Sequence, residues 1–322
     1  MKNLQIFSKR GFETWPSWDL VYEWEDALKE ALHVPIVEEP QFVRNRYLKR
    51  LPMMKYLCIP SGKMSFSFHM SPDLRFHSMN VSTVLPCIID FYLKDEQLIS
   101  FEKAYRHNPV VFISSREVYD HLKEKGLSLN IQHLPLTISD KYAISPDTHF
   151  EKQYDLVLMG RQNKILQGFL EEYIKRHKDF VYVYRKQENG KFLYFTSAGK
   201  ELGDINTREE YISLMRKAKC SIYGTPGIDD GEERCNGYSQ VTPRFLEFIA
   251  AGCHVIARYK ENSDTEFFEL DKFCKSINDY SSFEASLDYD RSHEVDIPKY
   301  ASFLKKHYTS SIVEIITNNI FN

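Results

Sequence analysis

The sequence predicts an α/β protein of two units, each built on a mainly parallel, doubly wound sheet with helices on both faces. The chain of 322 residues suits two domains of about 150 residues, each large enough for its own core. Short apolar runs alternate with amphipathic segments twice over, which is typical of parallel sheets. A polar, irregular stretch at 139–152 separates the two series and is the predicted linker. We therefore place the first unit at 1–145, the second at 146–298 and a closing helix at 299–322.

The first half is predicted to be a series of strands joined by helices. Trp18–Leu32 has the apolar spacing of a helix with one buried face, whereas Val84–Asp90 is a continuous apolar run of strand length. By the same criteria, strands are predicted at 4–7, 34–37, 56–59, 64–68, 84–90, 110–114 and 131–134. Helices are predicted between them at 18–32, 42–51, 97–105 and 117–125.

The second half restarts the same pattern. Tyr154–Met159 is an apolar strand that runs into Gly160-Arg161 and a helix ending near His177. Further strands are predicted at 181–184, 220–223 and 253–258, and further helices at 209–218 and directly after 242. The last segment, Lys299–Ile320, places apolar side chains at helical spacing and is predicted to be one helix. Residues 267–277 show no clear period.

Composition excludes several classes of protein. The net charge is −3, with 42 Lys and Arg against 45 Asp and Glu, whereas a dedicated nucleic-acid binder would be strongly basic. No apolar run approaches the roughly 18 residues that span a bilayer, and we recognise no signal peptide. We therefore expect a cytoplasmic protein that does not bind nucleic acid.

The six cysteines carry no metal-binding pattern. The sequence has no CxxC pair and no His/Cys cluster with ligand spacing. Several of the cysteines lie in apolar strands, as buried free thiols do. We expect a reducing compartment, no structural zinc, and neither another metal nor a cofactor.

The most informative segment is 239–259, which reads as a polar loop, a short helix, a glycine stop and a buried strand. Thr242 is a good N-cap residue, and Pro243 suits the first helical position. The first turn therefore offers free backbone N–H groups and the positive end of a helix dipole, which suit a phosphate. Arg244 adds a fixed charge at this end.

Glu247 lies one turn further into the same helix. It shares a face with small side chains, so its carboxylate can reach a ligand hydroxyl from a position outside the core. A phosphate site and a hydroxyl acceptor one turn apart fit the diphosphate and ribose of a nucleotide. The alternative is an ordinary amphipathic helix with a surface glutamate.

This segment resembles the donor-binding helix of GT-B glycosyltransferases, particularly the group-1 branch with the spore-maturation-type and many bacterial polysaccharide enzymes. The residues that match are Thr242, Arg244, Phe245, Glu247, Ala250, Ala251, Gly252 and Val255-Ile256-Ala257. The resemblance implies that the first turn and Arg244 hold a diphosphate and that Glu247 binds the ribose. It also implies two Rossmann-like domains facing a cleft, with a C-terminal helix that crosses back to the first domain.

Two further turns are candidate donor-binding elements. Similar enzymes place a Gly-Arg and a nearby Lys where Gly160, Arg161 and Lys164 stand, to neutralise the departing diphosphate. Fixed cations at such a place stabilise the charge that builds on the leaving group. Gly224 and Thr225 follow another strand, where the loop of a GT-B enzyme borders the nucleotide. The alternatives are solvated basic residues at a helix start for the first turn and an ordinary strand–loop junction for the second.

One position departs from the family pattern. Retaining group-1 enzymes often carry a second glutamate eight positions before the ribose-binding one, and this chain has Ser239 there. Ser239 remains a candidate contact to the sugar or phosphate. The departure leaves open whether the reaction retains or inverts the anomeric configuration.

An inverting enzyme needs a group that takes the proton of the acceptor hydroxyl. Asp90, which ends the strand 84–90, is the first candidate, because the corresponding strand end in similar enzymes often carries a His or Asp. His69, which follows the strand 64–68, is the second. An aspartate at a strand end also commonly caps the next helix, which is the alternative.

A basic, aromatic-bearing segment lies in the first half. Its cations are Arg44, Arg46, Lys49, Arg50 and Lys55, interleaved with apolar and aromatic residues. Such a helix can dock on an anionic membrane surface, and enzymes that extend lipid-linked glycans often do so from the cytoplasmic side. A solvated basic helix face is the alternative.

These features predict a glycosyltransferase that moves a sugar from a nucleotide diphosphate-sugar to a hydroxyl acceptor. The resemblance points to bacterial surface polysaccharide or glycoconjugate synthesis, with a glycan or lipid-linked glycan as acceptor and no bound metal. Two alternatives stay open. One is a GT-B-fold nucleotide-sugar epimerase, which would release free sugar without an acceptor. The other is a non-catalytic, nucleotide-sugar-binding subunit of a transferase complex.

Overall fold

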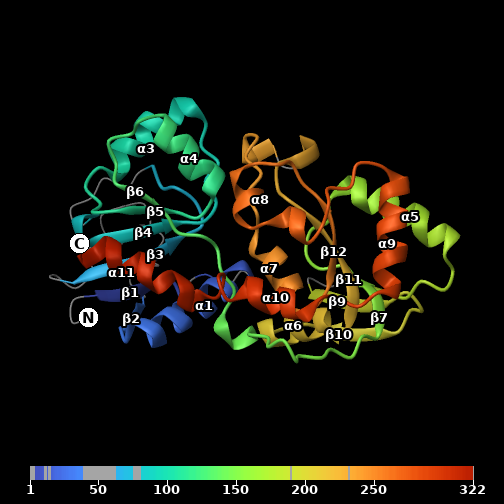
Figure 1. The fold of residues 1–322 in the computed structure, drawn as a ribbon. Helices are drawn as coiled ribbons and strands as arrows, with labels where there is room; N and C mark the ends of the chain where they lie inside the picture. Colours follow the sequence, from blue (N-terminus) through green and yellow to red (C-terminus); the bar gives the residue numbers. More distant parts are fainter. Residues whose placement is uncertain are drawn as a thin grey trace. The chain divides into compact units, whose positions relative to one another are not determined.

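A computed structural model of the protein describes residues 4–10, 13, 16–38, 63–74, 81–188, 191–230 and 233–321. The chain divides into two compact units. Unit 1 comprises Met1–Lys141, Arg234–Tyr238 and His307–Asn322, and unit 2 comprises Tyr142–Glu233 and Ser239–Lys306. Within the described residues, each unit contains one six-stranded sheet, and both sheets can be followed in Figure 1.

The sheet of unit 1 is parallel throughout its described pairings, in the order β2-β1-β3-β4-β5-β6. Its strands are β1 (Leu4–Ser8), β2 (Ile36–Glu38), β3 (Met64–His69), β4 (Val84–Ile88), β5 (Val111–Ile113) and β6 (Ile131–His133). Its helices are α1 (Pro16–Leu32), α3 (Leu98–Tyr105), α4 (Arg116–Glu124) and α11 (Val313–Phe321). Because β1 lies between β2 and β3, the strand order reverses direction at β1 and β3.

Alternation along the strands of unit 1 supplies apolar side chains to both faces of the sheet. On one face, α3 and α4 contribute Phe101 and Val118 to a buried cluster with Ile113. On the other face, Trp24 of α1 packs against Phe68, with 5.5 Å between the ring centroids. The sheet is therefore covered on both sides, as the doubly wound prediction requires.

The sheet of unit 2 has the order β10-β9-β8-β7-β11-β12. Its strands are β7 (Tyr154–Val157), β8 (Tyr182–Glu188), β9 (Lys191–Thr196), β10 (Glu201–Asp204), β11 (Ala218–Gly224) and β12 (His254–Arg258). Its helices are α5 (Lys164–Arg176), α6 (Arg208–Arg216), α7 (Pro243–Ala250), α8 (Ser263–Phe267), α9 (Tyr280–Ser292) and α10 (Ile297–Leu304). The four neighbouring strands β8, β7, β11 and β12 are parallel to one another. At the edge next to β8, the pairs β8–β9 and β9–β10 are antiparallel.

The two faces of this second sheet are also covered. Leu170 of α5 and Phe283 of α9 form a buried cluster with Ile222 on one face. On the other face, Phe245 of α7 lies against Tyr223 of β11, with 5.8 Å between the ring centroids. Phe245 is fully buried, so α7 is anchored to the sheet by a large aromatic side chain.

Four elements of unit 2 are absent from the sequence-based prediction. The antiparallel strands β9 and β10 and the helices α8 and α9 lie in segments for which no element is predicted. The predicted strand 181–184 continues to Glu188, because β8 pairs with β9 up to Glu188 and Lys191. The sheet is therefore mainly, rather than wholly, parallel.

The prediction of one continuous helix over 299–320 is wrong. The segment forms α10, a 3-10 turn at Thr309–Ile312 and α11. The backbone between them bonds to the chain at Ile138 instead of continuing the helix: the Ile138 amide donates to His307, and the Thr309 amide donates to Ile138. α10 groups with unit 2 and packs against α7, whereas residues 307–321 group with unit 1.

Several predictions fall outside the described residues. These are the helix at 42–51, the strand at 56–59, and the basic side chains from Arg44 to Lys55 proposed for membrane contact.

Among the helices that the structure describes, none is long and apolar enough to cross a membrane. Cys87, Cys220, Cys235, Cys253 and Cys274 are free thiols.

Candidate functional site

The strand order of unit 2 reverses direction at β7 and β11, which lie side by side. Open α/β sheets bind ligands beyond the carboxyl ends of the strands at such a reversal. The two turns at this place are Gly160-Arg161 after β7 and Gly224-Thr225 at the end of β11. Both turns contain residues that the sequence predicted for donor binding.

The turn after β7 allows a very close approach by Arg244 of α7. Gly160 has a φ of +65°, a conformation that favours glycine. A Cβ atom at Gly160 would lie 2.3 Å from Nη2 and 2.6 Å from Cζ of Arg244. The guanidinium therefore lies directly on the backbone of this turn, and the structure brings together two of the predicted residues.

Neutral groups hold Arg244 in this place. Its Nη1 donates to the carbonyl of Arg161 at 3.1 Å, and its guanidinium hydrogen-bonds the side chain of Tyr211. Within the described parts of the chain, Arg244 forms no ion pair with a carboxylate. The Glu247 carboxylate acts on Arg244 electrostatically, but its ion pair is with Arg208, so the half-buried Arg244 guanidinium can still bind an anion.

Alanine at position 160 should displace this guanidinium. We expect Gly160→Ala to destabilise unit 2 by about 1–3 kcal/mol, because it combines the strain of a positive φ with the clash against Arg244. Gly126 provides the matched control, since it has the same φ of +65° and open space around its Cβ direction. Chemical denaturation should show a larger loss for Gly160→Ala than for Gly126→Ala. Equal losses would contradict the contact.

Glu247 is buried, so the expectation that it lies outside the core is wrong. Its carboxylate accepts a hydrogen bond of 2.5 Å from Nη2 of Arg208, the first residue of α6. The two side chains are 5% and 14% exposed. The cation from α6 compensates the burial of the carboxylate, which is why the sequence can place a glutamate on the inner side of α7.

Helix α7 begins at the predicted residues, but the Thr242 side chain does not cap it. Thr242 is the N-cap residue and Pro243 stands in the first turn. The Thr242 hydroxyl makes no capping hydrogen bond; instead the Thr242 amide donates to the hydroxyl of Tyr223 at 2.9 Å. Tyr223 of β11 therefore fixes the start of α7, which carries Arg244.

The loop between β11 and α7 is closed by polar contacts among predicted residues. The hydroxyls of Thr225 and Ser239 lie 2.6 Å apart, and both residues are buried. The side-chain amide of Asn262 donates to the Ser239 carbonyl at 3.1 Å. These contacts hold Ser239 against the end of β11 and give it a structural role.

An acid–base pair that the sequence did not reveal fastens the same loop. Asp229 accepts two hydrogen bonds of 2.6 Å from Arg258 of β12 and one of 3.0 Å from Asn163, the N-cap of α5. The hydrogen bonds from Arg258 hold the pKa of Asp229 below its usual range. Lys164 begins α5 next to this contact and is exposed, as is Arg161.

The described residues contain no group of three or more His, Cys, Asp or Glu side chains that could hold a metal ion. Asp229, whose neighbour Asp230 makes the loop look like a metal site in the sequence, is paired with Arg258. The Asp229 carboxylate is therefore engaged by a guanidinium rather than open to a cation.

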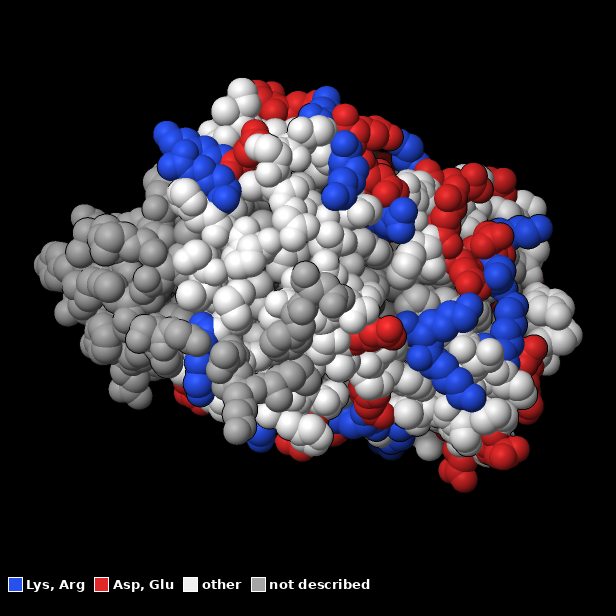
Figure 2. Space-filling view, turned by 60° about the vertical axis from the view of Figure 1, so that its left-hand side comes forward, with Lys and Arg blue, Asp and Glu red and all other residues white. Residues whose placement is uncertain are grey.

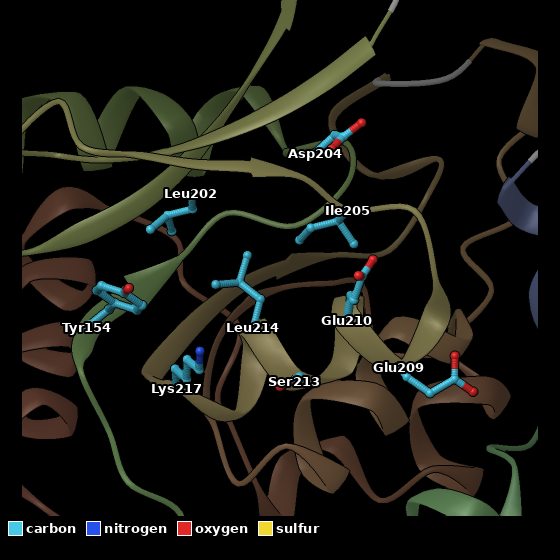
Figure 3. A pocket seen from close by; sticks show the side chains of 9 residues that line it. All are labelled: Tyr154, Leu202, Asp204, Ile205, Glu209, Glu210, Ser213, Leu214 and Lys217. Atoms are coloured by element: carbon cyan, nitrogen blue, oxygen red, sulfur yellow. The ribbon is translucent and has the colours of Figure 1, made fainter.

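Unit 2 also has a pocket of 480 Å³ along α6 (Figure 3). Leu202, Ile205 and Leu214 form its apolar middle, and Tyr154 and Lys217 lie at one side. Its other side carries the carboxylates of Asp204, Glu209 and Glu210. An acidic lining repels phosphate, and none of the predicted donor-binding residues lines this pocket, so we do not place the nucleotide there.

The two candidate bases lie at the same edge of the unit 1 sheet. His69 ends β3 and pairs in register with Ile88 of β4. The Asp90 amide donates to the Met70 carbonyl at 2.8 Å, so Asp90 lies just beyond the paired region of the neighbouring strand. His69 is buried and Asp90 is partly buried.

The reversal of strand order in unit 1 brings a further set of polar residues to this edge. Ser8 ends β1, next to β3, and donates a hydrogen bond of 2.6 Å to Glu25 of α1. Arg10 donates to the same Glu25 oxygen at 3.2 Å and to Asp26 at 2.8 Å. These residues are not predicted from the sequence, because an acid inside an amphipathic helix gives no signal of its burial.

Burial raises the pKa of Glu25 to about 7, against the lowering effect of the hydrogen bonds from Ser8 and Arg10. The carboxyl group is 1% exposed. Since the folded-state pKa lies above the ordinary value near 4.5, ionisation favours the unfolded chain. The stabilising contribution of Glu25 is complete below about pH 4.5 and is lost as the pH rises through about 7.

We expect Glu25→Gln to remove this pH dependence. Between about pH 4.5 and pH 8, the wild-type protein should lose about 3 kcal/mol of unfolding free energy that the variant keeps. Urea unfolding at both pH values measures the difference. Glu30→Gln, an exposed change on the same helix, should behave as wild type, and parallel pH profiles for wild type and Glu25→Gln would contradict the burial.

Charged side chains of both signs are interspersed on the face seen in Figure 2. Among the residues drawn in colour, Lys and Arg stand next to Asp and Glu. This mixture agrees with the net charge of −3.

The fold is similar to those of several solved structures. AviGT4, a glycosyltransferase involved in avilamycin A biosynthesis, matches with a TM-score of 0.58 and 10% identity over 98% of this chain and 96% of its own. The N-terminal domain of trehalose-6-phosphate phosphatase from Candida albicans matches with a TM-score of 0.57 and 9% identity over 98% of this chain and 96% of its own. A putative UDP-N-acetylglucosamine 2-epimerase from Listeria monocytogenes matches with a TM-score of 0.55 and 10% identity over 98% of this chain and 95% of its own. No protein-family profile and no curated protein sequence matches the chain.

At these identities the likeness concerns the fold alone. The chain has the two-unit, Rossmann-like α/β architecture of the GT-B enzymes, with a six-stranded, mainly parallel sheet in each unit. The fold class predicted from the alternation of strands and helices is confirmed. Solved structures of a glycosyltransferase and of a putative UDP-N-acetylglucosamine 2-epimerase both have this architecture.

Proposed function

We propose that the protein is a glycosyltransferase that moves a sugar from a nucleotide diphosphate-sugar to a hydroxyl of a glycan or lipid-linked glycan. The observation that carries the proposal is Arg244. It is half-buried, lies on the Gly160 turn at the reversal of strand order, and has no carboxylate partner among the described residues. A nucleoside diphosphate leaving group supplies the negative charge that this arrangement lacks.

The proposed roles follow the geometry of unit 2. Arg244 and the first turn of α7 bind the diphosphate, and the Gly160-Arg161 and Gly224-Thr225 turns border it. Arg208 holds one oxygen of Glu247, and the other oxygen accepts the ribose hydroxyls. Asp90 or His69 of unit 1 takes the acceptor proton. We further propose that the reaction needs no metal and serves surface polysaccharide or glycoconjugate synthesis in the cytoplasm, with membrane contact through the segment 42–55.

Thermal unfolding in the presence of UDP, GDP, TDP, CMP and their sugars tests the binding part. A nucleotide present at about 100 times its Kd stabilises the folded protein by about 2.7 kcal/mol, which raises the Tm measurably. We expect at least one nucleoside diphosphate to do so. If none of the nucleotides raises the Tm, the proposal fails.

The products formed from the stabilising nucleotide sugar separate the proposal from its two rivals. A glycosyltransferase transfers labelled sugar to an acceptor and releases the nucleoside diphosphate. An epimerase releases free or epimerised sugar without any acceptor. A non-catalytic subunit binds the nucleotide sugar and leaves it unchanged in both assays.

A further inference from the structure

The β8–β9 hairpin brings another arginine to the carboxyl end of β7. The Leu158 amide donates to the Val183 carbonyl at 2.9 Å, so Arg185, two residues later, stands beside the turn that follows β7. Its Nη2 lies 3.5 Å from the Gly160 carbonyl oxygen. We predicted that this strand ends at Tyr184, and the extension to Glu188 is what places Arg185 here.

Neutral neighbours hold the Arg185 guanidinium on two sides. Its Cζ lies 4.0 Å from the centre of the Phe192 ring, and it hydrogen-bonds the side chain of Tyr194 on the neighbouring strand β9. Across the part of the chain that the structure describes, Arg185 makes no ion pair with a carboxylate. A planar guanidinium fixed by a ring and a hydroxyl loses little conformational freedom when an anion binds.

Arg185 and Arg244 converge on the same turn. Arg244 lies against Gly160 from the side of α7, and Arg185 approaches the Gly160 carbonyl from β8. Both charges also act on the pKa of the Tyr194 hydroxyl, which burial raises and the two guanidiniums lower. Glu247, the carboxylate that acts electrostatically on Arg244, is ion-paired with Arg208. Among the described residues, neither Arg185 nor Arg244 therefore has a carboxylate in an ion pair of its own.

We propose that Arg185 and Arg244 form a two-guanidinium clamp that binds two adjacent phosphates and makes the site select diphosphates over monophosphates. The inference rests on the proposed nucleotide-sugar function and adds to it a binding residue on the β8–β9 hairpin. One guanidinium on each side of Gly160 matches a ligand with two linked anionic groups, because each phosphate then has its own fixed cation. A single phosphate can use only one of them fully.

Inorganic pyrophosphate and orthophosphate are suitable probes, because they carry the charge pattern without a base or sugar. Calorimetry should show that the wild-type protein binds pyrophosphate more tightly than orthophosphate. Arg185→Gln should weaken pyrophosphate binding about tenfold or more, reduce the preference for pyrophosphate, and change orthophosphate binding much less. Arg185→Lys keeps the charge but loses the planar, two-donor guanidinium. Its affinity for pyrophosphate should lie between those of the wild type and Arg185→Gln.

Lys186→Gln is the matched control, since Lys186 is the next residue, is exposed, and lies over Tyr184 and Phe195. It should bind both probes as the wild type does. If Arg185→Gln keeps the wild-type preference while Arg244→Gln loses affinity, the clamp is overturned and the proposed function stands. If the wild-type protein binds neither pyrophosphate nor any nucleoside diphosphate, both are overturned. Unchanged thermal unfolding of Arg185→Gln excludes misfolding as the cause of its weaker binding.

Discussion

Replacing Arg244 with glutamine is expected to weaken the binding of nucleoside diphosphates by about 10- to 150-fold, the range of one charge-assisted hydrogen bond. Binding of the corresponding nucleoside should hardly change, because the guanidinium lies at the Gly160 turn and is directed at phosphate. Calorimetric titration of the variant with a nucleoside diphosphate and its nucleoside measures both effects. The fold should survive, since the substitution removes hydrogen bonds to one carbonyl and one tyrosine hydroxyl and leaves no buried charge unpaired.

Arg176→Gln is the control for this change. Arg176 lies in α5 of the same unit, is more than half exposed, and pairs with Glu172 one turn away. It should bind nucleoside diphosphates like the wild type. Equal affinities for wild type and Arg244→Gln would remove Arg244 from the donor site and, with it, the observation on which the proposed function depends.

Glu247→Ala is expected to lower the unfolding free energy by about 3 kcal/mol, because it leaves Arg208 largely buried without its carboxylate. The loss should be measurable in urea at about pH 7. The double variant Arg208→Met/Glu247→Leu should recover part of it, since an apolar pair of similar volume needs no compensation of charge. This differs from the behaviour of a surface glutamate, whose removal changes stability little.

Glu261→Ala serves as the reference for a surface glutamate in unit 2, because Glu261 is exposed. Its unfolding free energy should lie within about 0.5 kcal/mol of the wild type. A Glu247→Ala variant as stable as Glu261→Ala would show that the Arg208–Glu247 pair does not hold α7 against α6.

The sequence predicts well those elements whose ends carry local signals. Thr242-Pro243 and Gly252 bound α7, and the structure has its N-cap and its positive φ at these residues. Asn189-Gly190 is an equally strong hairpin signal, and reading it would have predicted β9 and extended β8 to Arg185. The helix α9 also had a signal in Asp279, the N-cap residue whose carboxylate accepts a hydrogen bond from the Ser282 amide. Few positions of α9 are apolar, so its helical period is weak.

Long-range contacts account for what the sequence could not predict. Arg208 and Glu247 stand 39 positions apart, and no local pattern indicates that they pair. The break between α10 and α11 results from hydrogen bonds to Ile138, about 170 residues earlier. The same holds for Glu25: its spacing in α1 predicts a helix, but its burial beside Ser8 depends on how α1 packs on β1.

A crystal structure of the protein with the nucleoside diphosphate that stabilises it most tests the central claim directly. We expect the diphosphate between the first turn of α7 and the Gly160 turn, in contact with Arg244, and a ribose hydroxyl on the free oxygen of Glu247. A nucleotide bound elsewhere, for example in the pocket along α6 with Arg244 untouched, would contradict the donor site.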